Sequence, residues 1–203
     1  MKTVDIGKYN TMATFGVILL LLGSLDSIES DPLSQNQPSL LFSIIGFILF
    51  SVAMYKYSKI FQNSHIMKNY LIAVGLSLVP GFFSALLSDS GYNTPENLIN
   101  LIINISFIGT YISSIVALFF IKNTLLELYK HLKHRLFKIT SWIYFGAGVT
   151  LINLLGIQMI SIHSNSDIKE DPLVSLTTLV IFIVSILLVI AFFKAPSLVE
   201  VPE

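Results

Sequence analysis

The 203-residue sequence contains no cysteine. Disulfide bonds, thiol nucleophiles and thiolate metal sites are therefore excluded. Charged residues are also scarce, at 12% of the chain, whereas soluble domains carry about 25%. Lysine plus arginine and aspartate plus glutamate are equal, at 12 each. The net charge is therefore zero, and no basic excess indicates a nucleic acid partner.

Long apolar runs account for most of the chain, which is 54% hydrophobic with a mean hydropathy of +0.77. A helix that crosses the hydrocarbon core needs about 20 mostly apolar residues. Six runs approach this length, at residues 12–28, 40–54, 70–87, 98–121, 139–162 and 173–193. They predict an all-α polytopic membrane helix bundle, with residues 1–203 as one integral membrane domain. For the first run, a signal peptide is the alternative, although no Ala-x-Ala type cleavage site follows it.

The basic residues predict the orientation, because cytoplasmic loops carry an excess of lysine and arginine. Only Lys169 lies in a connector that follows an odd-numbered run; every other basic residue lies in an even-numbered connector or near a terminus. Most acidic residues show the opposite distribution. Both termini are therefore predicted on the cytoplasmic side of a cell membrane.

The connector between the second and third runs, 55–70, carries three lysines and three tyrosines. Its lysines suit a cytoplasmic position and its tyrosines a membrane interface. The stretch Ile66-Met67-Lys68-Asn69-Tyr70-Leu71, followed by Val74-Gly75, resembles an uncharacterised and mainly archaeal family of multi-pass membrane proteins, the domain of unknown function numbered 996. A basic stretch before Gly146 and the ending Ala191-Phe192-Phe193 are similar in order. The resemblance implies a membrane protein and carries no known activity. The end of the connector, 66–71, is expected to pack against residues 125–138.

Between the fourth and fifth runs, leucines and Tyr129 recur every three or four residues, and basic residues occupy the other side. This pattern predicts an amphipathic interfacial helix over about 123–138. The alternative is that the fourth span continues as one longer helix. The basic face of the predicted helix comprises Lys130, Lys133, Arg135 and Lys138.

His131 and His134 lie three residues apart in the same stretch, a spacing compatible with a shared metal ion. The basic neighbours would repel a cation, so a solvated basic face is preferred and no metal site is predicted.

The apolar runs contain amides but no ionisable side chain at mid-length. Asn104 and Asn153, on the fourth and fifth runs, differ in depth by roughly 4–5 Å at 1.5 Å per residue. We therefore expect these two spans to pack together through amide hydrogen bonds. A polar cavity open to the outside is the alternative. Two further amides lie nearer the outer ends, Asn100 and Gln158.

Small residues repeat every four positions along the third run, at Ala73, Ser77, Gly81 and Ala85. Such repeats allow two helices to approach closely. Pro80 is expected to bend this helix, because it removes a backbone hydrogen bond and clashes with the preceding turn.

The sequence contains no nucleophile–base set, metal cluster or phosphate loop, so no enzymatic activity and no cofactor are predicted. The leading interpretation is a non-catalytic structural or accessory component, with the lipid bilayer, a second copy or other membrane subunits as partners. The alternative is a transporter or channel for a small uncharged or lipid-like solute. A lipid enzyme is a third interpretation, with His65, His131 and His134 as its candidate residues.

Overall fold

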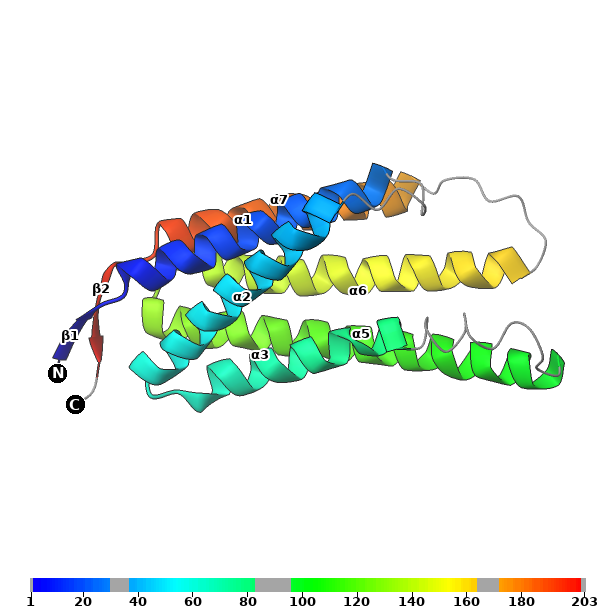
Figure 1. Cartoon of the computed structure of the whole chain (residues 1–203), viewed down its shortest axis with the longest axis horizontal. Coiled ribbons are helices and arrows are strands. Elements are labelled where there is room, and N and C mark those ends of the chain that lie inside the picture. Colours follow the sequence, from blue (N-terminus) through cyan, green and yellow to red (C-terminus); the bar gives the residue numbers. More distant parts are fainter. Residues whose placement is uncertain (1, 30–36, 83–95, 164–171, 202–203) are drawn as a thin grey trace.

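The computed structural model describes residues 2–29, 37–82, 96–163 and 172–201. In this part of the chain six long helices run back and forth along one axis (Figure 1). Their bounds are as follows: α1 Gly7–Glu29, α2 Gln37–Ile60, α3 Ser64–Ser77, α5 Glu96–Leu132, α6 Arg135–His163 and α7 Pro172–Phe193. The predicted helical bundle is confirmed.

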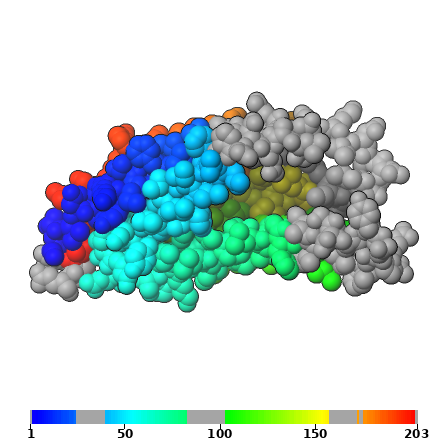
Figure 2. Space-filling model, viewed as in Figure 1, coloured from blue at the N-terminus to red at the C-terminus, as the bar shows by residue number. Residues whose placement is uncertain are grey.

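Each helix packs against its neighbours in sequence. Because α1 also packs against α7, the helices are arranged as a closed ring. The helix α2 crosses obliquely from beside α1 to the start of α3 (Figure 1). Farther from their turn α2 and α3 diverge, so that part of α6 is visible between them (Figure 2).

Two short strands, β1 Lys2–Asp5 and β2 Leu198–Val201, were not expected from the sequence. They pair antiparallel, with Lys2 opposite Val201 and Asp5 opposite Leu198. The pairing brings both ends of the chain to one end of the bundle, beside the α2–α3 and α5–α6 turns (Figure 1). Every basic residue in the described part of the chain lies in the segments gathered there, 2–10, 55–70, 122–138 and 194–201. We call this the basic end.

Four helical segments in the described residues are long and apolar enough to cross a membrane: Leu40–Ile60, Ile103–Leu132, Arg135–Gly156 and Ser175–Phe193. They correspond to the second, fourth, fifth and sixth predicted spans. Large apolar side chains are exposed on the outside of these helices, for example Ile48, Ile108 and Ile183, at 53%, 57% and 48%. Surfaces of this kind are unusual on soluble monomers and are expected where lipid surrounds the protein.

Among the described residues, the buried core lies mainly at the basic end. Fully buried side chains there come from most of the elements and include Ile6, Tyr57, Ile66, Leu128 and Phe192. The helix α3 packs along α5, and Ile66 shares this core with Leu125 and Leu128. The expected contact between the 66–71 segment and the 125–138 stretch is therefore confirmed.

The predicted interfacial helix over 123–138 is wrong. Residues 123–132 form the last three turns of α5, which continues without a break to Leu132, and residues 135–138 begin α6. No proline or cap interrupts α5, and the apolar side of the amphipathic stretch is covered by protein instead of lipid. Leu125, Leu128 and Leu132 are 3%, 0% and 3% exposed.

Candidate functional site

A cluster of aromatic rings fills the centre of the basic end. Phe192, near the end of α7, packs edge-on against Phe50 and Phe137, with ring centroids 5.8 and 4.9 Å away. It also stacks on Tyr57, which in turn stacks on Phe61. The ring of His131 lies parallel to Phe61 at 4.6 Å. Since these rings come from α2, α5, α6 and α7, the cluster joins helices that are distant in the sequence.

Asn10, on α1, ties this cluster to the C-terminal segment. The Tyr57 hydroxyl donates a 2.6 Å hydrogen bond to Asn10 Oδ1. Asn10 Nδ2 donates to the carbonyl oxygens of Ala195 and Pro196, at 3.2 and 3.1 Å. Asn10 is only 5% exposed, and its bonds to Tyr57 and to the carbonyl oxygen of Ala195 are buried. The amide thus joins α1 to two other segments, α2 and the residues that follow α7.

Asn63 holds the α2–α3 turn to α5. Its Oδ1 accepts a hydrogen bond from the backbone N–H of His65, which caps the N-terminus of α3. Its Nδ2 donates to Glu127 Oε2 at 2.9 Å and lies 3.1 Å from His131 Nε2. Glu127 also accepts from Lys130 Nζ at 2.6 Å. One amide therefore combines a helix cap with a contact between helices.

The two histidines of the basic stretch are packed against protein and do not form a solvated face. His131 stacks on Phe61 and contacts Asn63. His134 lies near Phe137, and its Nδ1 is buried without a hydrogen-bond partner in the described part of the chain. Among the described residues, no group of three or more metal-ligating His, Asp or Glu side chains comes together.

The four residues of the predicted basic face, Lys130, Lys133, Arg135 and Lys138, are all exposed. Lys130 pairs with Glu127, and Lys138 Nζ lies 6.0 Å from the centre of the Tyr129 ring. They surround the α5–α6 turn, in which Lys133 has a positive φ of 51°.

The expected packing of the fourth and fifth spans is confirmed, because α5 and α6 lie side by side. Asn153 joins them, but its partner is Tyr111: the tyrosine hydroxyl donates to Asn153 Oδ1, and Asn153 Nδ2 donates to the carbonyl oxygen of Val149. Asn104 is exposed on α5. The side chains of Asn100 and Gln158 lie outside the described part of the chain.

Of the predicted small-residue stripe, Ala73 is buried, whereas Ser77 and Gly81 are exposed and Ala85 lies outside the described residues. A Cβ atom at Gly81 would have no heavy atom of the described residues within 4 Å. The close approach occurs between α1 and α2, where a Cβ at Gly16 would lie 2.9 Å from the backbone nitrogen of Phe50. The helix α3 ends at Ser77, before Pro80.

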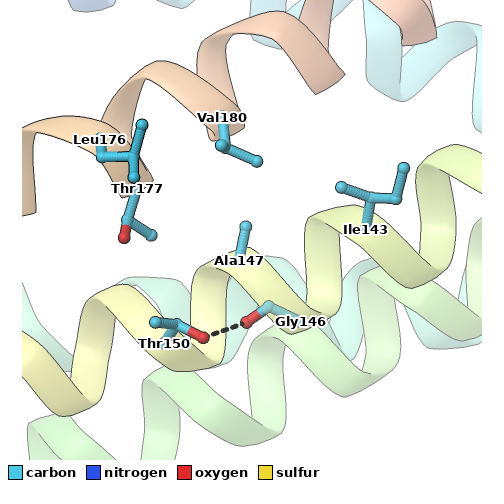
Figure 3. Close-up of a pocket in the computed structure, with 7 residues that line it drawn as sticks. All are labelled: Ile143, Gly146, Ala147, Thr150, Leu176, Thr177 and Val180. Carbon is cyan, nitrogen blue, oxygen red and sulfur yellow. Dashed lines mark hydrogen bonds between the residues drawn. The ribbon is translucent and has the colours of Figure 1, made fainter. Parts of the chain in front are cut away.

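An open groove of about 380 Å³ lies between α6 and α7 (Figure 3). Its walls are mainly apolar, with Ile143, Ala147, Leu176 and Val180, and also include Thr150 and Thr177. The hydroxyl of Thr150 donates to the carbonyl oxygen of Gly146, as the dashed line shows, and does not point into the space as a free donor. A groove of this chemistry suits a hydrocarbon chain better than a polar solute.

Sequence reasoning missed Asn10, Tyr57, Tyr111 and the pair Gly16 and Gly46. Asn10 and Tyr57 are single polar residues at the ends of apolar runs, where solvated or interfacial side chains are the ordinary expectation. Each glycine stands alone among large residues, without the four-residue repeat that signals close packing. The nearest signal was the tyrosine-rich composition of 55–70.

Comparison with known proteins identifies the family of this chain but does not identify an activity. The family described as Protein of unknown function (DUF996) matches residues 42–165. This range includes most of α2 and all of α3, α5 and α6, with the Asn63–Glu127 and Tyr111–Asn153 contacts. No match was found among curated proteins or among solved structures. Because the match spans more than half of the chain, the protein belongs to the DUF996 family.

Proposed function

We propose that the protein is a structural or accessory component of a complex in a prokaryotic cell membrane, without catalytic activity of its own. One observation carries the proposal: the polar side chains at the centre of the basic end are used to hold helices together. Asn10 and Asn63 each satisfy several groups from separate segments. The outer surface combines exposed apolar helix faces with an exposed basic rim. Such surfaces suit lipid and other membrane subunits.

The basic end is proposed to face the cytoplasm, because basic residues are retained on that side. Since the chain has no cysteine, single cysteines can test this directly. Lys133→Cys at the basic end and Lys169→Cys in the predicted outer connector would be treated in intact cells with a membrane-impermeant maleimide. We expect labelling at position 169 only, and labelling at position 133 after the cells are opened. Labelling of position 133 in intact cells would show that the basic end faces the outside, which contradicts the proposed orientation.

The accessory role is tested by purifying the tagged protein from its native membrane in a mild detergent. We expect a second membrane protein to remain in fixed stoichiometry through two chromatographic steps. Lys133→Glu combined with Arg135→Glu changes the exposed rim without touching the buried core and should weaken that association. If the protein is always recovered alone, the accessory proposal is wrong.

A carrier or channel for a lipid-like or small uncharged solute is the second candidate, and the apolar groove between α6 and α7 favours it. Ala147→Phe would fill this groove. If the protein is a carrier, proteoliposomes should show flux above empty liposomes, and Ala147→Phe should abolish it. Gly75→Leu adds apolar bulk where a Cβ would meet no atom within 4 Å, and it should leave flux unchanged. Equal flux in empty liposomes and in proteoliposomes would remove this candidate.

A further inference from the structure

Lys122 is a buried cation enclosed by aromatic rings. The residue is only 8% exposed. Its Nζ lies 4.4 Å from the ring centre of Trp142, 4.6 Å from Phe119 and 4.8 Å from Phe145. Phe119 and Lys122 belong to α5, whereas Trp142 and Phe145 belong to α6. The outer seam between these two helices therefore forms an aromatic box around one ammonium group.

The rings offset only part of the cost of removing this ammonium from water. In the part of the chain that the structure describes, no carboxylate lies within ion-pair distance of Lys122. Among the same residues, no carboxylate lies within ion-pair distance of Lys138 either. Lys138 lies one turn before Trp142 on α6, and its Nζ lies over the Tyr129 ring. Two cations thus share this seam without a protein anion, so an external anion would complete the site.

The depth of the box identifies the anion. In the four turns of α5 before Lys122, on the side toward the bundle centre, the exposed side chains are Ile108, Ile112 and Phe119, all apolar. On the other side the exposed residues are charged, from Lys130 to Lys138. Lys122 and Trp142 therefore lie where an apolar surface gives way to a charged one. In a bilayer this is the level of the lipid headgroups, where tryptophan is enriched.

We propose that the Lys122 box and Lys138 together bind the headgroup phosphate of an anionic phospholipid, whose acyl chains lie along the apolar outer face of α5. The site is independent of whether the protein is an accessory subunit or a carrier. It differs from the attraction of any basic surface to a membrane, because it depends on two lysines of one seam and not on the total charge.

Trp142 is the only tryptophan in the chain, so its fluorescence reports on the box directly. The full-length protein would be reconstituted in phosphatidylcholine vesicles that contain a small fraction of dibrominated lipid, either phosphatidylglycerol or phosphatidylcholine. Bromine quenches tryptophan on contact. We expect the brominated phosphatidylglycerol to quench Trp142 with about fivefold higher apparent affinity, the factor expected for one basic side chain near an anionic surface. Equal quenching by the two lipids would overturn the proposal.

Variants separate this site from general surface charge. The lipid preference is the ratio of the apparent affinities for brominated phosphatidylglycerol and brominated phosphatidylcholine. Lys122→Gln should bring this ratio close to one, whereas Lys122→Arg should retain most of the preference. Lys138→Gln, at an exposed position, should reduce the preference without affecting folding. Lys133→Gln removes the same charge outside the seam and should leave the preference intact. A loss in Lys133→Gln equal to that in Lys138→Gln would overturn the site. Inorganic phosphate should not compete with the lipid. If the lipid preference is lost when phosphate replaces chloride at equal ionic strength, the ligand is a free anion and the proposal is overturned.

Discussion

Gly16 and Gly46 face each other where α1 and α2 cross, so closely that a Cβ atom at Gly46 would lie 2.8 Å from the carbonyl oxygen of Gly16. The same Cβ would lie 2.8 Å from the backbone nitrogen of Leu20. Backbone atoms cannot move aside as a flexible side chain can. The two helices can therefore keep this separation only if neither position carries a side chain.

Gly46→Ala is expected to push α1 away from α2 and to lower the free energy of unfolding by about 1–3 kcal/mol, as overpacking of a close contact does. Denaturant titration in detergent micelles, followed by circular dichroism, would measure the change. Gly75→Ala is the matched control, because a Cβ there would meet no heavy atom within 4 Å. The control is expected to be neutral or slightly stabilising, by up to about 1 kcal/mol, since alanine favours a helix over glycine. Similar destabilisation by both substitutions would contradict the contact.

Asn10→Leu should be among the most damaging single substitutions at the basic end. It removes the acceptor of the Tyr57 hydroxyl and the donor to the Ala195 and Pro196 carbonyl oxygens. Each buried polar group left without a partner costs about 1–3 kcal/mol. We expect the C-terminal segment to detach, which limited proteolysis would detect as earlier cleavage after α7.

Tyr57→Phe tests the same contact from the other side. In the double variant with Asn10→Leu no unpaired hydroxyl remains, so the loss of unfolding free energy should be smaller than the sum of the two single losses. Thr11→Ala is the control, because among the described residues the Thr11 hydroxyl donates to the carbonyl oxygen of Gly7 in its own helix and to no other helix. Strict additivity in the double variant would mean that Asn10 and Tyr57 are not coupled.

Asn63 performs two roles that substitution can separate. Asn63→Ala removes both the cap of α3 and the contact with Glu127 and His131, and should cost at least the ~1 kcal/mol typical of a lost cap. Asn63→Asp keeps the capping oxygen but places a carboxylate beside Glu127. We expect it to retain the α3 helix, observed by hydrogen exchange at the first turn, while α3 and α5 separate at this end. Wild-type stability in Asn63→Ala would show that neither role matters.

The α2–α3 and α5–α6 turns each contain a residue in the left-handed region, with φ of 50° at Gln62 and 51° at Lys133. This region disfavours residues with a Cβ by roughly 1–2 kcal/mol, and glycine carries no such penalty. Lys133→Gly is therefore expected to be neutral or to raise the melting temperature. Lys133→Val removes the same charge and should lower the melting temperature, because a branched Cβ fits this conformation worst. The reverse order of the two melting temperatures would exclude the left-handed turn.

Much of the architecture follows from patterns that are local in the sequence. Runs such as 40–54 and 173–193 are apolar enough to predict membrane helices, and their helical state needs no partner because a helix satisfies its own backbone. The segregation of the basic residues predicted that the termini and the even-numbered connectors share one side. The structure places the two strands and both turns together, in agreement with that grouping. The Ile66–Leu71 motif predicted the family that residues 42–165 match.

Which helix faces pack against one another is determined only in the tertiary structure. The leucines at 125, 128 and 132 form the same stripe whether lipid or protein covers it, and in the structure α3 and the aromatic cluster cover it. Asn153 bonds to Tyr111, about two turns beyond Asn104 on α5, because the packing of α5 against α6 determines which side chains lie at the same depth. Hydrocarbon tails are as apolar as leucine. Burial in lipid and burial in protein therefore leave the same pattern in the sequence, and only the packed bundle distinguishes them.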